Sequence, residues 1–255
     1  MKTLRLVLLL IAAAACAARA DIPPGWGTDY PLAVATAQAA QHPVLVYFTA
    51  SWCGPCKLMT RTTLADPPVQ QVISGIGHVG VDIDQHQDIA TQYGVNAVPT
   101  FILLSSGGDE VERTTGYQAT ADFLKWLNNS ISEAQAAAAA KAIATQKLAT
   151  VDQLLVATGT DSVQQAAANL FDLCDERDAA IVKSAAARLA SLAARNPSAL
   201  LDGLNDHRLA TRIQVANVLE AKIGEKFDID PWSDPATREK AVQSWRRQLA
   251  GVPGS

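Results

Sequence analysis

Cysteine is scarce in this chain, with four residues among 255, at positions 16, 53, 56 and 174. An exported protein held together by disulfides carries more cysteines, usually in even number, so disulfides do not build the scaffold here. The four histidines, His42, His78, His86 and His207, are scattered and show no ligand spacing. A C-x-x-C pair needs a second pair of ligands to hold zinc. We therefore expect no metal site.

Long apolar runs are equally rare, and the only one lies near the start, at residues 6–15. It follows two basic residues and is too short for a membrane-spanning helix, which needs about 20 residues. The small residues of Ala18-Arg19-Ala20 suit a signal peptidase, so residues 1–20 are predicted to be a signal peptide. In the alternative, residues 13–16 form a lipoprotein box and Cys16 is lipidated. Either way we expect a periplasmic or secreted protein.

An excess of positive charge is also lacking. The whole chain has a formal net charge of −4, and the chain without residues 1–20 has 18 basic and 25 acidic residues, a net charge of −7. Nucleic acids and anionic membrane surfaces attract basic proteins. This balance argues against both as partners.

The most informative motif that is present is W-C-G-P-C at residues 52–56, directly after an apolar run at residues 44–49. The run predicts a buried strand, and residues 56–64 predict a helix. Cys53 then lies at a helix N-terminus, where unpaired N–H groups and the helix dipole favour a thiolate. Because the thiolate is the nucleophile of thiol–disulfide exchange, Cys53 is the predicted attacking residue.

The composition changes near residue 132, which predicts two domains. Residues 21–132 alternate between strand and helix patterns, residues 133–147 form an alanine-rich linker helix, and residues 148–255 show only helical patterns. Within the first domain the patterns predict a mixed sheet covered by helices. Strands are expected at 44–49, 78–83, 100–104 and 110–115, and helices at 31–41, 56–64 with a restart at Pro67-Pro68, 88–93 and 120–128.

Several motifs in register resemble the thioredoxin family over roughly residues 30–130. They are W-C-G-P-C-K at 52–57, V-D-I-D at 81–84, Y-G-V at 93–95 leading into V-P-T at 98–100, and Gly116. The stretches T-L-A-D-P-P-V at 63–69 and H-P-V-L-V at 42–46 are similar to periplasmic thioredoxin-like domains of the DsbD C-terminal type. The resemblance implies an α/β thioredoxin fold.

The resemblance also implies roles for individual residues. Cys53 attacks a substrate disulfide and Cys56 resolves the mixed disulfide, with Trp52, Gly54, Pro55 and Pro99 as active-site support. Pro99 is expected to follow a cis peptide bond beside the cysteines, and Val98 and Thr100, which flank it, are expected to bind substrate. Core packing for Trp52 and a trans bond at Pro99 are the alternatives.

The sequence departs from the family at two positions. Thioredoxins carry a buried acid six residues before the first cysteine, and Tyr47 stands there; their buried lysine corresponds to Gly80. The acid is thought to assist deprotonation of the second cysteine, so another base or water must do so here. With an ordinary pKa near ~10, Tyr47 is a poor base at neutral pH, and we interpret it as a core aromatic.

The C-terminal domain is predicted to be all-α. Residues 200–219 resemble a HEAT-type repeat, and residues 150–173 are a weaker copy. A last helix, beginning near Pro235, is expected to pack as a cap, with partner binding as the alternative. Cys174 is expected to behave as a small buried apolar residue, with a reactive or intermolecular thiol as the alternative.

The sequence patterns together with the resemblance imply an exported protein-disulfide reductase that needs no cofactor beyond its own Cys53–Cys56 disulfide. The expected partners are disulfide-containing proteins and an electron-donor protein, which could be membrane-bound, while the helical domain selects or holds a protein partner. Gly54-Pro55 is the dipeptide of reducing thioredoxins. The alternatives are an oxidase or isomerase of the same fold, and a redox-inactive helical binding or assembly protein.

Overall fold

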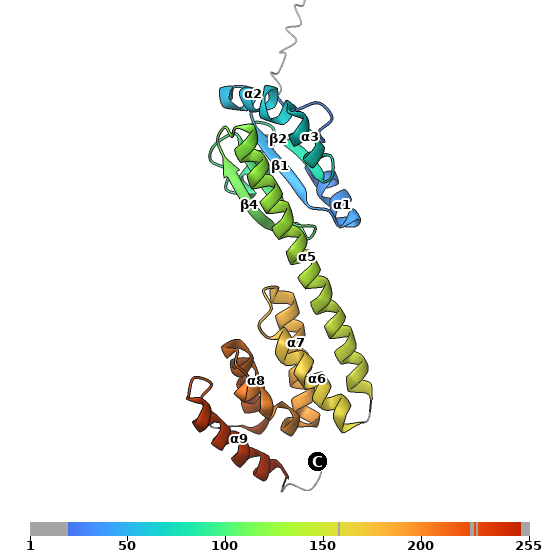
Figure 1. Cartoon of the computed structure of the whole chain (residues 1–255), viewed down its shortest axis with the longest axis vertical. Coiled ribbons are helices and arrows are strands. Elements are labelled where there is room, and N and C mark those ends of the chain that lie inside the picture. Colours follow the sequence, from blue (N-terminus) through green and yellow to red (C-terminus); the bar gives the residue numbers. More distant parts are fainter. Residues whose placement is uncertain (1–19, 158, 225–226, 228, 251–255) are drawn as a thin grey trace, which may run out of the picture. The chain divides into compact units, whose positions relative to one another are not determined.

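The computed structural model describes residues 20–157, 159–224, 227 and 229–250 (Figure 1). The chain divides between Ala138 and Ala139 into two compact units, and each is described by itself. The predicted signal peptide lies outside the described residues except for Ala20, and the predicted lipidation site, Cys16, lies outside them too. In the described part of the chain, none of the helices is long and apolar enough to cross a membrane.

The first unit alternates between helices and strands, as the sequence patterns predict. Its elements are α1 (Tyr30–Ala40), β1 (Val44–Thr49), α2 (Gly54–Arg61), η1 (Thr63–Ala65), α3 (Pro67–Ile73), β2 (Gly77–Asp82), α4 (Gln87–Gln92), β3 (Thr100–Leu104), β4 (Glu110–Thr115) and the first part of α5 (Thr120–Val156).

The sheet of the first unit has four strands in the order β2-β1-β3-β4. β1 pairs with β2 in parallel and with β3 antiparallel, and β3 pairs with β4 antiparallel. All six residues of β1 are buried, because this strand is central and both its faces are covered. The predicted mixed sheet is confirmed, and β1 has the predicted bounds.

Helices cover both faces of this sheet, which gives three layers (Figure 1). Leu45 and Tyr47 point to the face that α2, α3 and the first part of α5 cover. Val46 and Phe48 point to the other face, against α1 and α4. Because successive side chains of a strand alternate between faces, the apolar run of β1 supplies both cores.

In the described part of the second unit, every regular element is a helix. After the last part of α5 it contains α6 (Thr160–Leu173), α7 (Ala179–Arg195), η2 (Pro197–Asn205), α8 (Leu209–Ile223) and α9 (Pro235–Ala250). One apolar core joins these helices and includes Leu170, Leu189, Leu204, Val215 and Val242. The predicted fold class, a thioredoxin-like sheet domain followed by a helical region, is therefore confirmed.

Residues 200–219, interpreted as a HEAT-type repeat, do not begin with the α-helix that such a repeat would have. The first half of this stretch is η2, a 3-10 helix, and not an α-helix. Gly203 lies inside it, and a Cβ at that position would be only 2.6 Å from Cε1 of Phe171. Close packing at a residue with poor helix propensity explains the irregular backbone. The HEAT-type assignment stays a prediction.

The separate helices expected at 120–128 and 133–147 are one continuous helix, α5. The sequence from Thr120 to Val156 contains neither glycine nor proline, and its centre is rich in alanine, the best helix former. Nothing in this stretch ends a helix, so a linker at 133–147 is not a distinct element. The domain limits at 132 and 147 stay predictions.

We expect Leu204→Ala to lower the free energy of unfolding of the second unit by about 2–5 kcal/mol, because the fully buried side chain would leave a cavity. Leu209→Ala is the matched control, since Leu209 is 38% exposed and should cost less than about 1 kcal/mol. Urea unfolding followed by circular dichroism measures both values. Equal losses in the two variants would contradict this account of the core.

Candidate active site

The two cysteines of the C-x-x-C motif meet at the start of α2. Their Sγ atoms are bonded at 2.04 Å, with Cα atoms 5.2 Å apart. Cys53 is the N-cap of the helix, and its Sγ accepts a hydrogen bond from the backbone N–H of Cys56 at 3.1 Å. Pro55 fits in the first turn because a proline there loses no helical hydrogen bond. The predicted pair therefore lies at a helix N-terminus.

The two sulfur-bearing residues differ in their surroundings. Cys56 is fully buried, whereas Cys53 retains a small exposed area and lies against the loop before β3. Its Sγ is 3.5 Å from the backbone oxygen of Val98. Because Cys53 Sγ carries no proton in the disulfide, this is a van der Waals contact and not a hydrogen bond. After reduction, the Cys53 thiol can donate a hydrogen bond to the same oxygen. An incoming group can reach Cys53 more readily than Cys56.

The loop beside Cys53 has the backbone geometry that the resemblance implies. The Val98–Pro99 peptide bond is cis. The Thr100 hydroxyl donates to the backbone oxygen of Ala97 at 2.8 Å and lies 3.0 Å from the Thr115 hydroxyl. Since the Thr100 side chain is used inside the protein, a role in binding substrate would fall to its backbone. That role, and the one expected for Val98, stay predictions.

Trp52 lies outside the core, with 65% of its surface exposed. Its indole N–H donates to the Asp84 carboxylate, 3.0 Å from Oδ2 and 3.3 Å from Oδ1. An exposed ring held in place by a charged acceptor supports the active-site interpretation over ordinary core packing. No sequence pattern predicts this contact of Asp84, although a position just after β2 is near the same edge of the sheet as Cys53.

Tyr47 is a core aromatic, as the sequence suggests. It is fully buried and stacks on Phe101 at 4.6 Å between ring centroids. Its hydroxyl donates to the backbone oxygen of Cys56 at 3.3 Å. Burial raises the pKa of the phenol above its ordinary value, so Tyr47 keeps its proton at neutral pH and cannot act as a base.

A family model for a thioredoxin-like domain matches residues 30–131. The thioredoxin of Rickettsia felis is 35% identical to this chain over 89 residues, which are 35% of this chain and 82% of that protein. This chain belongs to the thioredoxin family. Thioredoxin-like proteins work through a C-x-x-C dithiol or disulfide without a separate cofactor, and Cys53 and Cys56 supply that pair here.

Two solved structures with thioredoxin-like sequences are also similar to this chain. A thioredoxin from Thermus thermophilus is 34% identical, covers 41% of this chain and 84% of its own, and has a TM-score of 0.38. The oxidised C-terminal domain of DsbD from Neisseria meningitidis is 25% identical, covers 41% of this chain and 98% of its own, and has a TM-score of 0.37.

Among the described residues, no three histidine, cysteine or acidic side chains gather in a way that could hold a metal ion. His78, one of the scattered histidines, instead packs edge-on against Trp26 with ring centroids 5.3 Å apart. Its Nδ1 lies 3.0 Å from the backbone oxygen of Ile76. These contacts make His78 a packed residue of the first unit.

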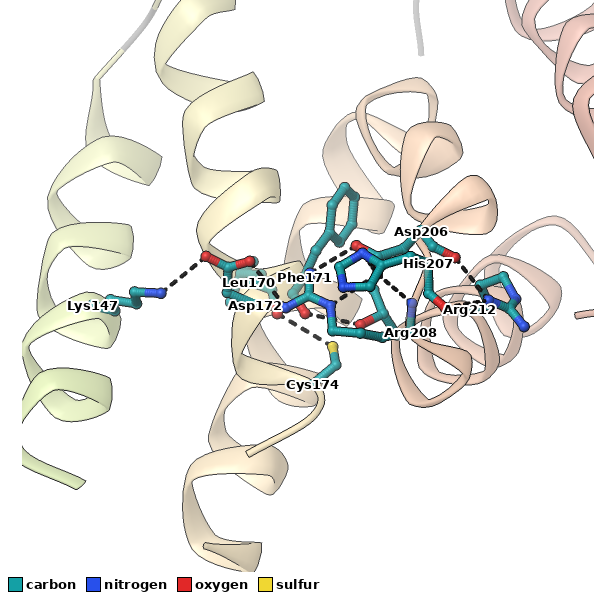
Figure 2. Close-up of polar contacts among 10 residues, drawn as sticks. Lys147, Leu170, Phe171, Asp172, Cys174, Asp206, His207, Arg208 and Arg212 are labelled. Atoms are coloured by element: carbon teal, nitrogen blue, oxygen red, sulfur yellow. Dashed lines mark hydrogen bonds and ion pairs between the residues drawn. The ribbon is translucent and has the colours of Figure 1, made fainter. Parts of the chain in front are cut away.

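Cys174 belongs to the core of the second unit. Its thiol donates to the backbone oxygen of Leu170 at 3.3 Å, and burial raises its pKa to about 12 (Figure 2). Beside it, the Arg208 guanidinium bridges Asp172 at 3.0 Å and Asp206 at 2.7 Å. These contacts support the interpretation of Cys174 as a small buried residue inside a structural polar network.

We expect Asp84→Ala to lower kcat/KM for a protein disulfide by about two- to tenfold, mainly through KM. The reason is that Trp52 loses a hydrogen bond that is exposed to solvent, and such a bond contributes about 0.5–1.5 kcal/mol because water competes for both groups. Asp84→Asn keeps an acceptor oxygen and should retain most of the activity. Steady-state insulin reduction measures both variants. Equal losses in the two, or a loss confined to kcat, would contradict a role in holding Trp52.

We expect native Cys174 to resist alkylation by iodoacetamide at pH 8, because a pKa of about 12 leaves very little thiolate. The fraction is roughly one in ten thousand, against roughly a quarter for a free thiol with a pKa near 8.5. Mass spectrometry of the reduced protein should find label on Cys53 first, and on Cys174 only in urea. Rapid native labelling of Cys174 would revive the alternative of a reactive thiol.

Proposed function

We propose that this protein is an exported thiol–disulfide oxidoreductase that reduces disulfides in other proteins through Cys53 and Cys56. The observation that carries the proposal is the pairing of these two cysteines at the N-terminus of α2, with Cys53 next to the Val98–Pro99 loop. Family membership supports the same chemistry, since a relative that is 35% identical over 89 residues is a thioredoxin. Protein disulfides are the expected substrates.

The reaction has two exchange steps. In the reduced protein the Cys53 thiolate attacks one sulfur of a substrate disulfide, that bond breaks, and the other substrate sulfur leaves as a thiolate that takes up a proton. The Cys56 thiolate then attacks Cys53 Sγ and releases the second substrate thiol. Because both cysteines lie in one helical turn, the second step is effectively unimolecular. Two electrons pass to the substrate, and the Cys53–Cys56 disulfide is formed.

The N-terminus of α2 favours Cys53 as the attacking residue. The Cys56 N–H that points at Cys53 Sγ from 3.1 Å would donate to a thiolate more strongly than to a disulfide sulfur, because hydrogen bonds to charged acceptors are stronger. The helix dipole acts in the same direction. Cys56, in the first turn of the helix and fully buried, suits the resolving role.

The direction of electron flow and the location of the protein rest on the sequence. Gly54-Pro55 between the cysteines supports the reducing direction by resemblance, and the composition of residues 1–20 supports export to the periplasm or secretion. Such a reductase needs an electron-donor protein to regenerate its dithiol. The helical unit would select or hold a protein partner, and it exposes Trp232, a residue type enriched at interfaces.

The reduction potential of the Cys53/Cys56 pair tests the proposal. We expect a value near or below about −270 mV, the value of thioredoxin, rather than the oxidising value of about −120 mV of DsbA. Equilibration of the full chain in thiol–disulfide buffers, with the bond followed by mass spectrometry, gives the potential. A value near the oxidising end would assign the protein to disulfide donation.

Two variants separate redox function from binding function. Cys56→Ala should accumulate mixed disulfides at Cys53 in an extract, because the resolving thiol is missing. Cys53→Ser should form none and should not reduce insulin. If Cys53→Ser left every phenotype of a deletion strain fully complemented, the protein would work as a binding or assembly protein instead.

A further inference from the structure

Asp82, the last residue of β2, has a carboxylate that is buried without a counter-charge. The residue is only 5% exposed. Its oxygens accept hydrogen bonds from the backbone N–H of Ala20 at 3.2 Å, the backbone N–H of Asp84 at 3.1 Å and the side-chain amide of Gln85 at 3.0 Å. Among the described residues, no lysine, arginine or histidine forms an ion pair with it. A buried carboxylate is costly unless a cation pairs with it.

The segment directly before α1 runs past this carboxylate. Residues 20–27 lie along the edge strand β2, where the backbone oxygen of Gly27 accepts from the N–H of Gly80 at 2.9 Å. Ile22 covers Gly80 so closely that a Cβ at position 80 would be 2.6 Å from Cγ2 of Ile22. Because alternate residues of a strand share a face, Asp82 lies on the same side of β2 as Gly80. The segment therefore reaches Asp82 next to the fixed position of Ile22.

Asp21 is held on both sides of its backbone nitrogen. Its backbone oxygen accepts from the Thr60 hydroxyl of α2 at 2.9 Å. The residue before it, Ala20, donates its N–H to Asp82, and the backbone oxygen of Ala20 accepts from the N–H of Ile22 at 2.9 Å. Since one residue spans about 3.8 Å between Cα atoms, the nitrogen of Asp21 lies about one residue length from the N–H that Asp82 binds.

Asp21 is also the predicted first residue of the processed chain. Signal-peptide cleavage after the A-R-A sequence at residues 18–20 hydrolyses the Ala20–Asp21 peptide bond. Water supplies a hydroxyl group to the Ala20 carbonyl carbon and a proton to the Asp21 nitrogen, which becomes an α-ammonium group at neutral pH. The cut therefore removes the Ala20 N–H from Asp82 and creates a cation one residue away.

An open cavity gives this new ammonium group room to approach the carboxylate. The cavity has a volume of about 400 Å³, and Asp82, Gln85 and His86 line it together with Trp26 of the segment before α1. A backbone N–H donates one hydrogen bond, whereas an ammonium group has three N–H donors and a full charge. Hydrogen bonds between charged partners are shorter and stronger than neutral ones.

We propose that Asp82 is the binding site for the α-ammonium group of the processed chain. The ammonium group on Asp21 takes the place of the Ala20 N–H and forms an ion pair with the buried carboxylate. Removal of the signal peptide thereby supplies the counter-charge that the fold otherwise lacks. This inference rests on export, which is part of the proposed function.

The ion pair is linked to the active site through the turn after β2. Oδ1 of Asp82 accepts from the N–H of Asp84, and the Asp84 carboxylate in turn accepts from the indole N–H of Trp52. Trp52 directly precedes Cys53. A bound amino terminus therefore stabilises the turn that holds an exposed residue of the active site.

The rate of acetylation of the α-amine tests the proposal, because only an unprotonated and accessible amine reacts. The mature protein is purified after export of the full-length chain, its first residue is checked by mass spectrometry, and N-hydroxysuccinimidyl acetate is added at pH 7. We expect the α-amine of Asp21 to react at least tenfold more slowly in the wild type than in Asp82→Asn. The ion pair keeps the amine protonated and holds it in the cavity. Lysine side chains of the same molecules serve as the internal standard.

Asp88→Asn is the matched control, since it removes an exposed carboxylate from α4 and should leave the rate at the α-amine unchanged. A second measurement needs no substitution: the wild-type α-amine should react at least tenfold faster in urea than in the native protein, relative to the lysines. This comparison decides the matter if Asp82→Asn does not fold. In addition, acetylation of the amino terminus should lower the melting temperature of the wild type but not that of Asp82→Asn.

A wild-type α-amine that reacts as fast as that of Asp82→Asn, or as fast as in urea, would overturn the proposal. An exported protein that begins at another residue, such as a lipidated Cys16, would overturn it too. A chain that keeps residues 1–20 would instead contradict export, and the ion pair can then be tested on protein produced with Asp21 as its first residue. If the α-amine is protected but the protein does not reduce insulin, the proposed reductase activity fails and this inference stands.

Discussion

The site depends on one constraint, the fixed start of α2 directly after the buried strand β1. Both faces of β1 pack into apolar cores, so the end of this strand has little freedom of position. The chain then turns at Trp52 and enters the helix, with Cys53 as the cap. Packing energy in the sheet thus sets the position of a sulfur atom, and the helix N-terminus sets its chemistry.

Polar groups around the dithiol are divided between internal and external use. The Thr100 side chain forms its hydrogen bonds within the protein, to the loop before β3 and to Thr115. The Asp82 carboxylate accepts hydrogen bonds from the turn after β2. Trp52 and the edge of Cys53 face outward. Because buried polar groups must be paired, the internal set stiffens the two loops that frame the cysteines, and the outward set is left for a partner.

Local patterns predicted most of the fold but not the contacts between distant segments. The apolar run of β1 gave its bounds directly, and motifs in register indicated the cis bond before Pro99. The continuity of α5 was missed because a change in composition resembled a boundary. The packing of residues 20–27 along β2 and the bond from Trp52 to Asp84 were missed for another reason. Residues 20–27 have no periodicity, and both features depend on tertiary packing.

Because Ile22 packs directly over Gly80, a substitution at either position constrains which residues the other position can hold. Any side chain introduced at position 80 meets Ile22, so it can be accommodated only when the segment before α1 moves away or is shortened. Conversely, a chain that lost this segment would leave a hollow beside β2 that a larger residue could fill. Engineering a charged pair into positions 47 and 80 therefore requires redesign of the segment around Ile22 as well.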